Sequence, residues 1–426
     1  MLFGGIMYEI ITMPNGVRLV FERMSGVRSA SVGIWVGVGS RLERHGEEGS
    51  AHFIEHMLFK GTVKSSAAKL AGRMDAIGGQ INAFTSRENT CFYARVLDSH
   101  LHEAVDILTE MFFDSLFDES EILNEREVIL DEIDMYRDTP EDLVVEQLLG
   151  KCFPGPLGKP VLGNAASLKK ISGSSLRVFK DNEYTPDRVL VSLCGNFDDA
   201  VLDHLQSRFS AMMPRTTHRF DRKSAYKPAC VFRRRSTEQN HFCLMWPGLH
   251  ADNEDRFSWQ VMSMILGGGM SSRLFQKVRE ENGLCYSIGS FTSSFSDAGL
   301  FGISTAVSRD TEEKALALIC SEINRFREDG IGKEELDRAR ELIKSSVILS
   351  LESTSSRMNR LGSSVLALGR CLTADEIIDR FNSVTADSVY EITRKTFTDS
   401  EISISAVGRL SSDTDRYRTL LGSLYK

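Results

Sequence analysis

A largely apolar stretch, residues 50–62, carries two histidines and a glutamate in the order H-x-x-E-H. Read as a helix with about 100° and 1.5 Å per residue, the stretch places His52 and His56 on one face, one turn apart, with Glu55 beside them. Two imidazoles at this spacing can bind one metal ion. A single histidine in a helix is more often a hydrogen-bonded core residue. Because polar groups on an apolar helix are costly without partners, the pair nevertheless predicts a metal site.

A second close pair, His100 and His102, has a different character. The two residues open a predicted helix and point about 200° apart, so we interpret them as surface residues. The eight cysteines are scattered without a C-x-x-C pair. This pattern indicates reduced core residues and neither a disulfide framework nor a thiolate zinc site.

Length and composition exclude several classes of protein. The 426 residues are enough for two domains. A net charge of -8 argues against a nucleic-acid partner. The sequence has no apolar run of about 18 residues, so we expect neither a membrane span nor a membrane partner. Residues 1–9 lack the pattern of a signal peptide or an organelle presequence, so the expected location is the cytoplasm.

Strand and helix patterns interleave along the first half of the chain. An Asn15-Gly16 turn between two alternating runs predicts a hairpin. Further strands are predicted over 29–37, 80–86 and 90–96, and helices over 65–77, 100–115 and 119–137. Because hairpins alternate with helices, the fold class is α+β, with a mostly antiparallel sheet covered by helices.

The second half repeats the order of strand, loop and helix, with a strand over 240–248 and a helix over 255–266. We interpret this repetition as a diverged duplication, although no second H-x-x-E-H occurs. The expected organisation is a zinc-binding domain, a linker and a metal-free second domain of the same fold, over residues 1–212, 213–228 and 229–426.

The helix predicted over 119–137 offers a third metal ligand. Residues 122, 125, 129, 132 and 136 form one helical stripe and read Ile, Glu, Ile, Glu and Tyr. Glu125 and Glu132 are thus predicted to be buried, so each must be paired, protonated or bound to a metal. A salt bridge to a neighbouring helix is the alternative, but the two-histidine site lacks a ligand and favours the metal.

Three segments of the chain resemble the M16, or pitrilysin, family of zinc peptidases, which includes the mitochondrial processing peptidase, insulin-degrading enzyme and small bacterial relatives. They are residues 52–62, residues 79–85 and the run Glu125-x6-Glu132. The resemblance implies two homologous domains of the processing-peptidase type and one Zn²⁺ per chain. It also implies that His52, His56 and Glu132 bind the zinc and that Glu125 supports a histidine ligand.

The resemblance extends to the substrate. Residues Asn82, Ala83, Phe84 and Thr85 resemble the edge strand on which the family docks peptides. Arg279 and Tyr286 lie in a pattern that also matches Leu274, Phe275, Gly283 and Leu284, and in the family such an Arg and Tyr help to bind substrate. Without the resemblance, Arg279 would be read as a helix-dipole partner and Tyr286 as a core residue.

The sequence therefore predicts a zinc-dependent endopeptidase for short or unfolded peptides, with Glu55 as general base and Arg279 and Tyr286 aiding catalysis. Two alternatives stay open: a non-catalytic scaffold or partner subunit of the same fold, and a zinc hydrolase acting on small molecules. The resemblance also implies a homodimer around an enclosed chamber, in which Arg279 and Tyr286 would face the zinc of the other protomer. A heteromer with another chain is the alternative assembly.

Overall fold

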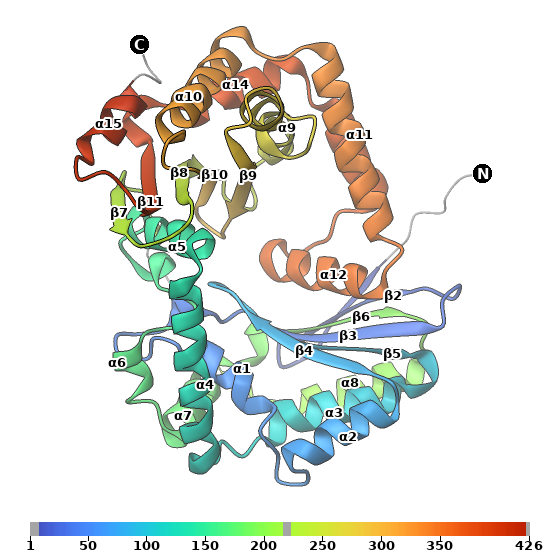
Figure 1. The fold of residues 1–426 in the computed structure, drawn as a ribbon. Helices are drawn as coiled ribbons and strands as arrows, with labels where there is room; N and C mark the ends of the chain where they lie inside the picture. Colours follow the sequence, from blue (N-terminus) through green and yellow to red (C-terminus); the bar gives the residue numbers. More distant parts are fainter. Residues whose placement is uncertain (1–7, 216–222, 423–426) are drawn as a thin grey trace. The chain divides into compact units, whose positions relative to one another are not determined.

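Two β-sheets with helices on both faces make up the computed structural model, which describes residues 8–215 and 223–422 (Figure 1). Contacts divide the chain into two compact units. Within the described residues, the first unit comprises 8–133, 159–215 and 348–374, and the second comprises 134–158, 223–347 and 375–422. Residues 216–222 of the predicted linker lie outside the described residues.

The first unit contains a six-stranded sheet in the order β1-β2-β6-β3-β5-β4, in which only the pair β2 and β6 is parallel. Its strands are β1 (Glu9–Thr12), β2 (Arg18–Arg23), β3 (Ser29–Val36), β4 (Gln80–Thr85), β5 (Thr90–Leu97) and β6 (Val189–Gly195). Its helices are α1 (Ser50–Leu58), α2 (Ala67–Ala76), α3 (Leu101–Asp114), most of α4 (Glu119–Asp138), α6 (Ala165–Leu168), α7 (Gly173–Glu183), α8 (Asp199–Ser210) and α12 (Thr354–Leu368).

Both faces of this sheet are buried, and the alternation along β3 shows why. Val32 and Ile34 point into the core beneath α1 and α3, whereas Trp35 points to the opposite face. Figure 1 shows α2, α3 and α8 on one side of the sheet and α12 on the other. Met358 and Leu361 of α12 join Trp35 in the second core cluster.

The second unit contains a five-stranded sheet in the order β7-β11-β8-β10-β9, in which only β7 and β11 are parallel. Its strands are β7 (Cys230–Arg234), β8 (Asn240–Gly248), β9 (Cys285–Ser294), β10 (Gly299–Val307) and β11 (Ser403–Gly408). Its helices are α5 (Pro140–Cys152), α9 (Arg256–Gly267), α10 (Glu312–Asp329), most of α11 (Lys333–Ser350), α13 (Ala374–Ser383), α14 (Ala386–Thr396) and α15 (Asp415–Leu421).

The two sheets share one topology. If the five strands β2 to β6 and the five strands β7 to β11 are each numbered in chain order, both sheets run 1-5-2-4-3 with the parallel pair between strands 1 and 5. The predicted α+β class, with two homologous domains built on mostly antiparallel sheets, is therefore confirmed.

The compact units depart from the predicted linear division at two helices. Helix α5 comes from the first half of the sequence but packs on β8 and β11, where Leu148 and Cys152 enter a core cluster of the second unit. Helix α12 comes from the second half but packs on β3 and β6 of the first. Each sheet would expose an apolar face without the helix from the other half of the sequence, because its own helices cover the opposite face.

Most predicted elements occur within a few residues of their expected bounds. Between α9 and β9 the chain forms a π-helical segment, Phe275–Glu280. Among the described residues, no helix combines the length and the apolar character needed to cross a bilayer.

Candidate metal centre

Helices α1 and α4 bring the three predicted metal ligands together. The imidazole centroids of His52 and His56 lie 4.6 Å apart on α1. Glu132 Oε2 on α4 lies 3.6 Å from His52 Nε2 and 3.7 Å from His56 Nε2. One potential ligand atom from each of the three residues falls within a group no wider than 4.8 Å.

This geometry fits a zinc ion. The separations from the carboxylate to the two imidazoles exceed the range of about 2.7–3.2 Å for a hydrogen bond. They lie close to the spacing of about 3.3–3.4 Å between two ligands of a tetrahedral zinc with bonds of 2.0–2.1 Å. A His, His and carboxylate set is typical of a catalytic zinc, which keeps its fourth position open.

Burial shapes the protonation of these groups. Burial and the neighbouring His56 lower the pKa of His52 to about 3, so the imidazole of His52 is neutral at physiological pH. The pKa of Glu132 is raised by burial, against the attraction of His56. A neutral imidazole has the free lone pair that metal binding requires.

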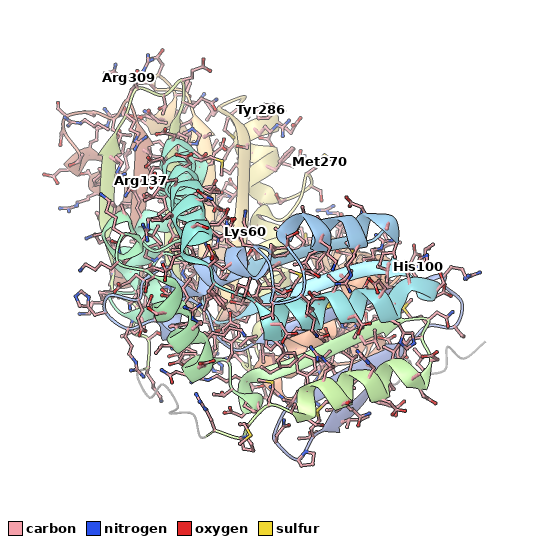
Figure 2. The ribbon with its side chains drawn as sticks, turned by 90° about the horizontal axis from the view of Figure 1, so that it is seen from below. Lys60, His100, Arg137, Met270, Tyr286 and Arg309 are labelled. Atoms are coloured by element: carbon pink, nitrogen blue, oxygen red, sulfur yellow. The ribbon has the colours of Figure 1, made fainter. Side chains whose placement is uncertain are left out.

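Glu125 holds one of the two histidines. It is 4% exposed, its Oε2 lies 3.0 Å from His56 Nδ1, and its Oε1 lies 2.5 Å from Lys60 Nζ. Lys60, labelled in Figure 2, lies just past the end of α1. Because the carboxylate accepts a hydrogen bond from Nδ1–H, the lone pair of His56 stays on Nε2, which faces Glu132. Nδ1 of His52 has no such partner within the described part of the chain.

Glu55 contacts the predicted docking strand. The Thr85 hydroxyl donates to Glu55 Oε2 at 2.5 Å, and Thr90 Oγ1 lies 3.3 Å from that hydroxyl. Burial raises the pKa of Glu55, while the bond from Thr85 lowers it. A carboxylate whose pKa is raised toward neutrality is suited to accept and return a proton.

Strand β4 forms one edge of the first sheet, since it pairs only with β5. Along it Asn82 is exposed, and Ala83, Phe84 and Thr85 are half-buried. The backbone N–H of Ala83 donates to Asn82 Oδ1 at 2.8 Å. An extended peptide could add to this open edge through backbone hydrogen bonds.

The predicted stripe on α4 needs a correction. Ile122, Glu125 and Ile129 are buried as expected, but the next buried residue is Ile133, and Tyr136 is 44% exposed. Glu132 is half-buried, with 27% of its side chain exposed. The stripe turns toward Ile133 because an α-helix has 3.6 residues per turn, and this turn leaves Glu132 at the border of the core.

Arg279 and Tyr286 lie in the second unit. The Arg279 guanidinium lies 5.2 Å from the centre of the Tyr286 ring and 4.6 Å from that of Phe275. Tyr286, labelled in Figure 2, belongs to the edge strand β9 and is 77% exposed, so it is not the core residue that its sequence position alone suggests. The two side chains form a cation–π pair at the edge of the second sheet.

Sequence reasoning missed two residues around the centre. Lys60 lies four residues after His56, a spacing that puts both on one side of a helix and could have indicated it. Glu43 is 2% exposed, and its carboxylate accepts hydrogen bonds from the backbone of Gly49 and Ala51 at the start of α1. No periodic pattern marks Glu43, because it lies in a loop.

Family models and relatives of known sequence match most of the chain. Residues 18–165 match the family model described as insulinase, peptidase family M16, and residues 170–343 match the model described as peptidase M16 inactive domain. An uncharacterized zinc protease of Bacillus subtilis, YmxG, is 42% identical over 92% of this chain and 96% of its own length. An uncharacterized zinc protease of Streptomyces coelicolor is 39% identical over 90% of this chain and 86% of its own length.

Solved structures share the fold. A peptidase M16 inactive domain from Pseudomonas fluorescens superposes with a TM-score of 0.87 at 19% identity, covering 95% of this chain and 98% of the other. A protease from Helicobacter pylori gives a TM-score of 0.86 at 19% identity, covering 94% and 99%. The two matched family models and the close relatives show that this chain belongs to the M16 family of peptidases.

Proposed function

We propose that the chain is a zinc-dependent endopeptidase that cleaves short or unfolded peptides. The observation that carries the proposal is the convergence of His52, His56 and Glu132 beside a partly buried Glu55. The names of the relatives as zinc proteases support the same conclusion. One zinc ion per chain, held by these three ligands, would polarise the scissile carbonyl and activate water.

Three side chains of this chain are proposed to perform the remaining steps. Glu55 accepts a proton from the attacking water and passes it to the leaving amine. Thr85 fixes one oxygen of Glu55, so the other oxygen is oriented for proton transfer. Glu125 maintains the tautomer of His56 that leaves Nε2 free to bind a metal.

The peptide is proposed to bind as an added strand along β4 at Asn82 to Thr85. Backbone pairing reads an extended shape more than a sequence, so cleavage should be broad among unstructured peptides. Arg279 and Tyr286 are proposed to hold the substrate and to stabilise the developing oxyanion. We also propose a homodimer, for which sedimentation combined with activity is the test: a fully active monomer contradicts it.

The test of the proposed function is cleavage of an unstructured fluorogenic peptide by the purified full-length chain. Cleavage should stop when a chelator removes the metal, return with added zinc, and be lost in Glu55→Gln although that variant still binds zinc. Arg95→Gln, on the exposed side of β5, is a matched control and should cleave normally. A wild-type chain that binds zinc and cleaves no peptide would contradict the proposal and favour the non-catalytic scaffold.

A further inference from the structure

The helix that carries His52 and His56 begins without a side-chain cap of its own. Its N-cap residue is Gly49, which adopts a left-handed conformation with φ of 95° and has no side chain to offer. The carboxylate of Glu43 takes over this task from six residues away. One oxygen accepts from Gly49 N–H and the other from Ala51 N–H, each at 2.9 Å. The first turn of the helix is therefore held from outside the helix.

Burying this carboxylate is costly, and the surroundings offset only part of the cost. Glu43 is 2% exposed, and burial raises its pKa to about 8, against the two N–H donors and Lys159. Lys159 Nζ donates to the backbone carbonyl of Glu43 at 2.5 Å. The two bonds to the start of α1 offset part of this cost, since hydrogen bonds to a charged acceptor are about twice as strong as neutral ones.

The same loop is tied to the hairpin that carries the proposed docking strand. The backbone N–H of Arg41 donates to Arg87 carbonyl at 2.9 Å, and the buried Arg41 guanidinium pairs with Glu88 at 2.5 Å. Ser40 N–H donates to Ser86 carbonyl at 3.3 Å. The loop over residues 39–49 thus joins the start of α1 to the turn between β4 and β5.

We propose that Glu43 is a positioning residue that fixes the first turn of α1, and with it His52, for metal binding. His52 directly follows Ala51, so a shift of the Ala51 backbone moves the imidazole relative to Glu132. The Arg41–Glu88 pair fixes the docking strand in the same way. This inference rests on the proposed function, and it assigns the two ends of one loop to metal binding and to peptide binding.

The test compares Glu43→Gln with Glu47→Gln in the full-length chain. Glu47 lies in the same loop, but its side chain accepts from Arg44 N–H and, within the described residues, caps no helix. Measurements are made in mildly alkaline buffer, because burial raises the pKa of Glu43 to about 8. Zinc affinity is measured by competition with a chromophoric chelator, and hydrogen exchange of α1 is measured in the metal-free protein.

Glu43→Gln keeps one acceptor oxygen but turns an amide N–H₂ toward a backbone donor. We expect the zinc affinity to fall about tenfold or more, as for other residues that orient ligands indirectly. Exchange at the start of α1 should quicken, and kcat at saturating zinc should fall while KM is unchanged. Glu47→Gln should match the wild type. Glu88→Gln should show the opposite pattern, with a raised KM and an unchanged zinc affinity.

Glu43→Asp decides the question if Glu43→Gln does not fold, because it keeps the charge and withdraws it by one methylene from the helix. The inference is overturned if the wild type binds zinc and cleaves peptide, and a folded Glu43 variant has the same zinc affinity and the same hydrogen exchange in α1 as the wild type. A wild type that neither binds zinc nor cleaves peptide would overturn the proposed function instead.

Discussion

Replacing Glu125 by glutamine tests how the centre selects the tautomer of His56. The wild-type carboxylate serves two donors, His56 Nδ1 at 3.0 Å and Lys60 Nζ at 2.5 Å. A glutamine side chain has one acceptor oxygen and one N–H₂ group, so it can serve only one of them. Because the ammonium of Lys60 can only donate, it takes the oxygen, and the N–H₂ group then faces His56 Nδ1.

That arrangement places the imidazole proton on Nε2, the atom that faces Glu132. Zinc binding must then reverse the tautomer and break a hydrogen bond, for which we expect a loss of about 10–100-fold in zinc affinity, or about 1.4–2.8 kcal/mol. The assay is chelator competition at neutral pH. Glu127→Gln, at an exposed position of the same helix, is the control. Equal zinc affinities in the two variants would show that Glu125 does not select the tautomer of His56.

Three further predictions concern stability. Gly362→Ala should lower the free energy of unfolding by about 2–4 kcal/mol, since its Cβ would lie 2.1 Å from Trp35 Nε1. Gly72→Ala, with open space around it, should raise the free energy of unfolding by about 0.5–1 kcal/mol. Equal denaturation midpoints of the two variants would contradict this prediction. Residues 1–222 alone lack α12, so they should bind a hydrophobic dye and unfold without cooperativity; a cooperative transition would contradict the exchange of helices. Burial lowers the pKa of Lys180 from 10.5 to about 8. Below pH 8 Lys180 is charged in both the folded and the unfolded state, and burying this charge lowers the free energy of unfolding. Lys180→Met should therefore stabilise the chain at neutral pH by at most about 1–2 kcal/mol, with a gain that fades as the pH rises from 8 to 10.5; a gain that grows with pH would contradict the sign.

Local patterns predicted most of the fold. The Asn15-Gly16 hairpin and the strand and helix patterns along the chain are short-range signals, and the structure has these elements. The exchange of α5 and α12 between the sheets had no such signal. Apolar residues in a helix predict that one side of it is covered, but they do not predict which sheet covers it.

The residues of the candidate centre also differ in whether the sequence alone predicts them. His52, Glu55 and His56 could be predicted because their spacing lies within one helix. Glu132 needed both the stripe on α4 and the resemblance, and the stripe misjudged its burial and that of Tyr136. Contacts such as Lys60 with Glu125 join residues far apart in the sequence, so they follow from the tertiary structure and from no sequence period.

X-ray absorption at the zinc edge of the purified chain reports the atoms bound to the proposed metal ion. We expect one zinc per chain with two imidazole nitrogens and at least one oxygen, all at about 2.0–2.2 Å, and no sulfur neighbour. Glu132→Gln should weaken this signal, since it removes the carboxylate that lies 3.6 and 3.7 Å from the two imidazoles. A chain that binds no zinc, or binds it through cysteine sulfur, would contradict the proposed metal centre.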